Sequence, residues 1–94
     1  MFKIMDNKVY GIPKATILKK LKRRGKWGGA HTSLNKLTSG IPKHLRGKAK
    51  DITKDLIREG LLLSKPTSYG LEVSLNPKRR KEIDEIIHEY LSKE

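Results

Sequence analysis

The sequence contains no cysteine, a single tryptophan and a single phenylalanine, and it has no Asp or Glu anywhere from Asn7 to Lys50. Without cysteine the chain can form neither a disulfide nor a thiolate metal site. No apolar run approaches the roughly 20 residues of a membrane-spanning helix, so we expect no membrane segment. The start, Met1 to Asp6, lacks the long apolar stretch of a signal peptide, and we expect a cytoplasmic protein.

Signatures of catalysis and metal binding are also missing. The chain has three His residues, and no two of them stand in metal-ligand spacing, which argues against a zinc site. The sequence shows no paired carboxylates of a pocket, no nucleophile elbow and no P-loop. A domain this small buries only about 60–65% of its unfolded surface and leaves no room for a deep catalytic cavity. We therefore expect neither an enzyme nor a bound cofactor.

The charge that is present is strongly one-sided. Lys and Arg total 22 against 10 Asp and Glu, which gives a net charge of +12. Nearly all the acidic residues follow Lys50. If the fold gathers the earlier basic residues on one side, their positive charges repel one another, and a bound polyanion reduces that repulsion. The alternative is a generic solubilising surface. Heat-adapted proteins are also Lys-rich, but they usually match Lys with Glu. We expect nucleic acid rather than a membrane surface, because no segment pairs a basic face with exposed Trp, Phe or Leu.

The first half of the chain predicts two helices. Residues 1–11 are ambiguous between a short strand and an arm packed on the body. A helix then begins at Pro13, because proline suits the first helical position, and Gly25 ends it. Thr32 or Ser33 caps a second, short helix that ends at Gly40.

A long helix is predicted over residues 42–59, and Gly60 stops it. At about 100° per residue, its apolar positions lie in one narrow arc and are expected to face the core. These positions are Leu45, Ala49, Ile52 and Leu56.

A β-hairpin is predicted over residues 61–75, with a turn at 66–70 and strict alternation in its second strand. Asn76 and Pro77 then cap and open a last helix over residues 77–92. Three helices, a hairpin and a C-terminal helix make an α+β domain.

This order, with a short second helix and a long basic third helix, resembles the winged helix-turn-helix family. The likeness is carried by residues 41–47, 56–62 and 68–77, and it is to small winged-helix proteins of archaeal type. It implies a single domain over residues 1–94, with the helix at 42–59 as recognition helix and the hairpin as wing. Winged-helix domains usually bind duplex DNA, and some bind RNA or other proteins. No strand is obvious between the first two helices, and the stretch around Ala30 to Thr32 is the place to expect a brief one.

The resemblance places the long helix in a major groove. Its outward side has four basic residues and one glycine within about 80° of arc. The members of this side are Lys43, Gly47, Lys50, Lys54 and Arg58.

The N-terminal half of that helix would lie deepest, so His44 and Arg46 join Lys43, Gly47 and Lys50 as candidates for base edges. Arg46 suits a bidentate contact to guanine, with a phosphate contact or a solvated side chain as the alternatives. His44 is either a donor to the nucleic acid or an ordinary surface residue. Gly47 marks either a close approach of the helix or the turn before a helix that begins at Lys48.

The hairpin tip is the second candidate contact, because hydroxyls and Lys suit phosphates. Its residues are Lys65, Thr67, Ser68 and Tyr69. Tyr69 either stacks on a sugar or base or packs over the hairpin.

Two further basic segments complete the candidate set. The last helix places Lys78, Arg79 and Arg80 in its first turn, where the helix dipole disfavours positive charge, which hints at a phosphate contact unless the following acids neutralise them. A loop after the first helix mixes bases with glycines and the only tryptophan, which either stacks on a base or fills the core. The loop candidates are Arg23, Arg24, Lys26 and Trp27.

Three functions fit these features. The first is duplex-DNA binding through the long helix and hairpin, as in a small transcriptional regulator. The second is RNA binding, including binding within a ribonucleoprotein such as the ribosome. The third is a protein-interaction module in which the apolar face of the last helix forms a homodimer.

Overall fold

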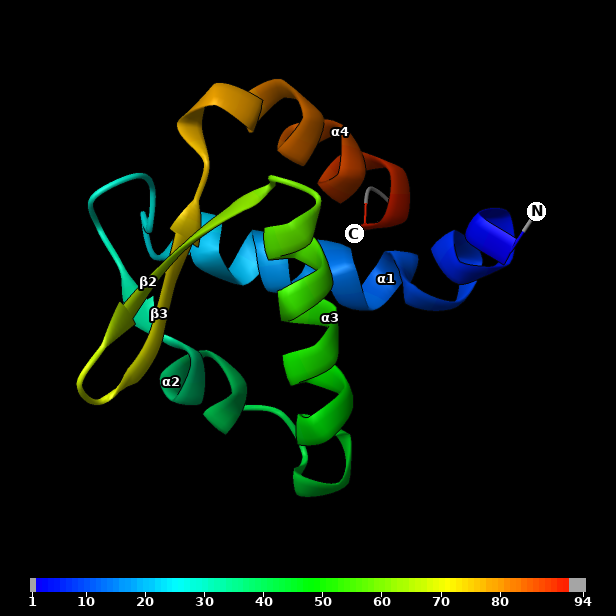
Figure 1. Cartoon of the computed structure of the whole chain (residues 1–94). Helices are drawn as coiled ribbons and strands as arrows, with labels where there is room; N and C mark the ends of the chain where they lie inside the picture. The colour runs from blue at the N-terminus through cyan, green and yellow to red at the C-terminus, as the bar shows by residue number, and fades with distance from the viewer. Residues whose placement is uncertain (1, 92–94) are drawn as a thin grey trace.

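The structure, a computed structural model, describes the backbone of residues 2–91 and the side chains of residues 11–91. It is an α+β domain with four helices and a small antiparallel sheet, which confirms the predicted class. In Figure 1, α1 (Phe2–Arg23) runs across the centre, α4 (Arg80–Leu91) lies above it, and α3 (Arg46–Arg58) crosses it. The prediction for residue 92 lies outside the described residues.

Helix α1 begins at Phe2, so the described part of residues 1–11 is helical, and the short strand that was one of the two expectations there is wrong. Pro13 lies inside the helix rather than at its first position. Residues 2–10 contain neither proline nor glycine, so nothing in that stretch stops a helix from beginning before Pro13. Farther along α1, Gly11 is buried against the ring of Tyr90 of α4. A contact with a distant helix carries no signal in the local sequence.

The sheet has the strand order β1-β3-β2, with antiparallel pairing throughout. Strand β1 (Thr32–Ser33) is the brief strand expected near Ala30 to Thr32. Strands β2 (Leu62–Thr67) and β3 (Gly70–Leu75) form the predicted hairpin. The turn is tighter than expected, because Thr67 pairs with Gly70 and Pro66 stays within β2. Proline is tolerated there because β2 is an edge strand.

Helix α2 (Leu34–Ser39) is capped by Ser33, whose hydroxyl accepts from the backbone N–H of Lys36 at 3.0 Å. After a turn, residues Lys43–Leu45 form a short 3-10 helix, and α3 begins only at Arg46. The predicted helix over residues 42–59 is therefore two elements. The break also changes the position of Leu45. Its side chain is 43% exposed and does not take the predicted inward position.

Helix α3 ends at a glycine as predicted. Gly60 has φ +83°, a backbone conformation that favours glycine. Its N–H bonds the carbonyl of Ile57, and the N–H of Leu61 bonds that of Leu56, each at 3.0 Å, which is a Schellman cap. Leu56 and Leu61 are both buried, so the cap also seals the core.

The start of the last helix is also split. Asn76 caps as predicted, since its side chain accepts from the N–H of Lys78, but residues Pro77–Arg79 form a 3-10 turn and α4 begins at Arg80.

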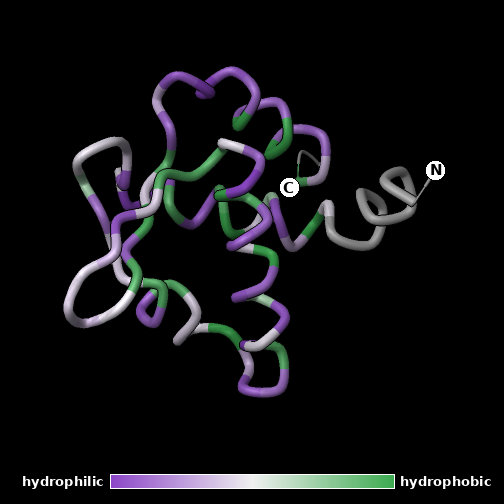
Figure 2. The backbone as a smooth tube through the Cα atoms, in the orientation of Figure 1, coloured by the Kyte–Doolittle hydropathy of each residue, from purple (hydrophilic) through white to green (hydrophobic). Residues whose placement is uncertain are grey.

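One apolar core joins α1, α2, α3, α4 and the base of the hairpin. Figure 2 shows the apolar stretches of α1, α4 and the strands lying toward the centre of the domain. The fully buried side chains include Leu18, Leu21, Leu37, Leu56, Leu62, Val73, Leu75 and Ile83. This core fixes the hairpin and α3 beside each other, because β2 packs against α3.

Candidate nucleic-acid interface

Three lysines lie on the outward side of the helical segment that was expected to read nucleic acid. Lys43 and Lys54 are exposed, and Lys50 is half-buried. None of the three has a hydrogen-bond or ion-pair partner among the described residues. No described side chain holds these ammonium groups by direct contact, so they are available to an anion.

The first turn of α3 is open to solvent. His44 and Gly47 are exposed. A Cβ atom placed on Gly47 would meet nothing within 4 Å. Gly47 is the second residue of α3, so the helix begins before it. The protein itself does not need a glycine here, which leaves room for another molecule to approach the helix backbone.

Arg46 holds the turn between α2 and α3. Its Nε donates to the carbonyl of Ile41 at 3.0 Å, and its Nη2 donates to the carbonyl of Ser39 at 3.1 Å. The expected contact to guanine would require the guanidinium to leave both carbonyls. The structure thus gives Arg46 a local role that the sequence pattern did not reveal.

Arg58 pairs within its own helix. Its Nη1 lies 3.1 Å from Oδ1 of Asp55, and its side chain is 77% exposed. An exposed pair of this kind contributes at most about 1 kcal/mol, so Arg58 can exchange Asp55 for another anion at little cost.

The hairpin tip presents its tyrosine to solvent. Tyr69 is 95% exposed. The hydroxyl of Thr67 donates to the carbonyl of Gly70 at 2.8 Å and accepts from the N–H of Tyr69 at 3.2 Å, so the turn is held from within. Ser68 is exposed beside it. Tyr69 does not pack over the hairpin, which was one of its two expected placements.

Lys65 lies farther back on the hairpin. It is exposed, and it stands directly opposite Glu72 in the register of β2 and β3. The acid at this cross-strand position offsets part of its charge.

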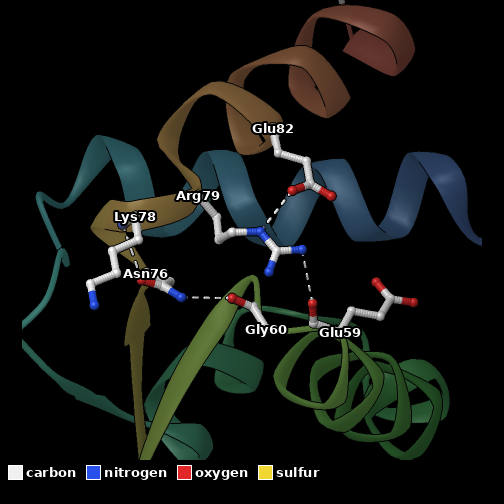
Figure 3. Close-up of polar contacts among 6 residues, drawn as sticks. All are labelled: Glu59, Gly60, Asn76, Lys78, Arg79 and Glu82. Carbon is white, nitrogen blue, oxygen red and sulfur yellow. Dashed lines mark hydrogen bonds and ion pairs between the residues drawn. The ribbon is translucent and has the colours of Figure 1, made fainter.

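The start of α4 is tied to the end of α3 (Figure 3). Arg79 donates from Nε to Glu82 at 2.7 Å and from Nη2 to the carbonyl of Glu59 at 3.3 Å. Asn76 donates from Nδ2 to the carbonyl of Gly60 at 2.9 Å. The pKa of Glu82 is lowered, mainly because the hydrogen bond from Arg79 favours the charged carboxylate. Burial acts in the opposite direction, and the positive charge of Arg79 adds a smaller lowering. Arg79 therefore joins two elements rather than standing free.

The two neighbours of Arg79 differ from each other. The guanidinium of Arg80 lies over the ring of Trp27, 4.4 Å from its centroid, in a cation–π contact. Lys78 is exposed and has no side-chain partner among the described residues.

The loop before β1 is pinned to the end of β3. The carbonyl of Lys26 accepts from the N–H of Leu75 at 2.7 Å, and the N–H of Gly28 donates to the carbonyl of Leu75 at 2.9 Å. Trp27 is half-buried against the core. Because Arg80 covers one part of its ring, Trp27 fits core filling better than base stacking. Arg23 and Arg24 are exposed at the end of α1.

Two lysines of α1 have roles that the sequence reading missed. Lys20 donates to the carbonyl of Leu37 at the end of α2 at 2.9 Å, and burial, followed by the charge of Arg24, lowers its pKa. Lys14 pairs with Glu59, the C-cap residue of α3, at 2.7 Å. A cation at the C-terminal end of a helix suits the helix dipole, but only the fold shows which cation reaches it.

Comparison of the chain with models of protein families, with curated proteins and with solved structures finds no match. Among residues 2–91, no helix has both the length and the apolar character to cross a membrane. The described side chains contain no group of three or more His, Asp or Glu residues placed to hold a metal ion.

Proposed function

We propose that the chain is a winged-helix protein that binds duplex DNA, with α3 in the major groove and the β2–β3 hairpin on the adjacent backbone. The observation that carries the proposal is a set of three lysines whose side chains have no partner among the described residues: Lys50 and Lys54 on α3, and Lys43 in the 3-10 turn before it. A small transcriptional regulator is the biological role that this mode of binding suits.

The topology supports the same reading. A short strand between α1 and α2 joins the hairpin in one sheet, in the order β1-β3-β2. This supplies the strand that was not obvious from the sequence. The turn that leads from α2 into α3 is held by Arg46 through two carbonyls, so the two helices keep a fixed angle, as a helix-turn-helix requires.

RNA binding is less well supported. That alternative rested on the acid-free basic half of the chain, which the structure leaves available, and on Trp27 as a stacking surface beside positive charge. The ring is half-buried on the core and lies under Arg80, so the stacking surface it offers is reduced.

A homodimer through α4 is also less well supported. Its apolar residues are already used by the protein's own core, with Ile83 fully buried and Ile86 and Ile87 packed against the same cluster.

The test is a titration of duplex DNA, single-stranded DNA and structured RNA, followed by fluorescence anisotropy at two or more salt concentrations. We expect the tightest binding to duplex DNA and a steep fall in affinity with salt. The double variant Lys50→Gln/Lys54→Gln should reduce the slope of log affinity against log salt by about 1.8, because each phosphate contact contributes about 0.9.

The matched control is Lys36→Gln/Lys81→Gln. It removes the same charge from exposed positions on α2 and α4 that have no side-chain partner among the described residues. If both double variants lower the affinity equally, the effect is one of net charge and α3 is not the contact surface. Equal, salt-independent affinity for all three nucleic acids would also refute the proposal.

A further inference from the structure

The arginines of this chain divide into two groups. In four of the six, the guanidinium group has a partner. The partners are two backbone carbonyls for Arg46, Asp55 for Arg58, Glu82 for Arg79 and the ring of Trp27 for Arg80. The other two, Arg23 and Arg24, have no hydrogen-bond, ion-pair or ring partner among the described residues. Guanidinium groups bind phosphate through paired N–H donors, so two unpartnered neighbours are a strong local attraction for it.

Both unpartnered arginines line one hollow at the C-terminal end of α1, beside the end of α4. The hollow has a volume of about 500 Å³, and its described lining residues include no acid. They are Thr16, Lys19, Lys20, Arg23, Arg24 and Leu91. Four cationic residues and one threonine therefore border the same hollow.

The cations of the hollow also act on one another. The pKa of Lys20 is lowered by burial and by the charge of Arg24. The Nζ of Lys20 is held at the carbonyl of Leu37, so Lys20 cannot move away from Arg24 without losing that bond. An anion in the hollow would reduce this repulsion, which makes binding favourable by the same electrostatic argument that applies to α3.

The hollow lies on a different side of the molecule from the lysines of α3. At about 100° per residue, Thr16, Lys19 and Arg23 lie about 140–160° around α1 from Leu21, which points into the core. Lys20 lies about 100° from Leu21, on the flank of the helix, and Arg24 follows its end. The side of α1 that reaches α3 is marked by Lys14, which pairs with Glu59. Two packed helices, each about 10 Å across, separate the outer faces by about 20 Å, which is more than two Debye lengths at physiological salt. Two polyanions on these faces would repel each other only weakly.

We propose that the hollow formed by Thr16, Lys20, Arg23 and Arg24 binds a phosphate of a second nucleic-acid segment, so that one protein molecule bridges two duplexes. The bridging part rests on the proposed function, because α3 and the hairpin hold the first duplex. The phosphate site itself does not depend on α3.

The first experiment uses inorganic phosphate as the probe and follows amide and arginine side-chain signals by NMR. We expect saturable shifts at Thr16, Arg23 and Arg24 in the wild type, and no such shifts in Arg23→Gln/Arg24→Gln. The variant Lys50→Gln/Lys54→Gln should keep them. Weak, unsaturated shifts spread over all surface lysines would overturn the site.

The second experiment measures bridging. An immobilised duplex is loaded with protein, and capture of a second, fluorescent duplex is recorded at equal occupancy of the first. Capture should fall at least fivefold for Arg23→Gln/Arg24→Gln and stay near wild type for Lys36→Gln/Lys81→Gln. Capture that is unchanged by the arginine variant, or absent from the wild type, contradicts bridging. If phosphate still shifts Arg23 and Arg24 while Lys50→Gln/Lys54→Gln binds duplex normally, the proposed role of α3 fails and the phosphate site stands.

Discussion

The ring of Tyr90 on α4 packs directly on the backbone of Gly11 in α1, at a point where a Cβ atom on Gly11 would overlap the ring. A methyl group there forces the Tyr90 ring out of its place against α1, and overpacking of this kind costs about 1–3 kcal/mol. Alanine recovers about 0.5–1 kcal/mol of helix propensity. We therefore expect Gly11→Ala to lower the free energy of unfolding by about 1–2 kcal/mol, measured by urea denaturation with circular dichroism.

The second helical glycine is the control for this experiment. Gly47 has open space where its Cβ would lie, so Gly47→Ala should raise the free energy of unfolding by about 0.5–1 kcal/mol. An equal change in both variants would mean that Tyr90 does not pack on α1 as described.

Arg46 offers a test of its two candidate roles. Arg46→Lys keeps the charge but cannot donate in a fork to the carbonyls of Ser39 and Ile41. We expect this variant to lose about 1 kcal/mol of stability, because two exposed hydrogen bonds are weakened. Unchanged stability together with a loss of discrimination between DNA sequences would instead assign Arg46 to a base.

Glu82 should titrate below its usual range in the folded protein, because the hydrogen bond from Arg79 favours its charged form. The sign follows from this direction: the pair stabilises the fold above the carboxyl's ordinary pKa of 4.5, and the contribution is lost as pH falls through the lower folded-state pKa. In Arg79→Gln, the pKa of Glu82 should rise toward that ordinary value. Carboxyl chemical shifts recorded from pH 2 to pH 7 measure the pKa of Glu82 in the wild type and in the variant. An equal pKa in the two proteins would contradict the pairing.

A substitution of Tyr69 can test nucleic-acid binding without disturbing the stability of the fold. It is almost fully exposed, so Tyr69→Ala should change stability by less than about 0.5 kcal/mol. If the hairpin contacts nucleic acid through Tyr69, the loss of this side chain should weaken duplex binding measurably, whereas stability stays unchanged. Tyr69→Phe is the matched variant and should bind close to wild type. Wild-type affinity in Tyr69→Ala would remove Tyr69 from the interface.

The sequence predicted the elements whose signals are local. Gly60 ends α3 because a single residue must adopt positive φ there, and Asn76 caps because its side chain reaches a nearby N–H. The hairpin followed from strict alternation, and the class of the fold followed from the order of these elements.

The sequence did not predict what depends on distant partners. Pro13 indicated a helix start, but α1 begins at Phe2 and carries Pro13 inside it. Leu45 fitted an inward arc, but a 3-10 turn changes its direction and exposes it. Arg46 and Arg79 looked like free cations because their acceptors include backbone carbonyls, which leave no trace in a pattern of side chains.

Trp27 also gives the protein a built-in optical reporter. It is the only tryptophan in the chain, and it sits where the loop after α1, the end of β3 and Arg80 of α4 meet. Its emission will therefore follow the separation of these three segments without any added dye. A spectral change on unfolding that coincides with the loss of helical signal would show that the joint and the helices come apart in one step.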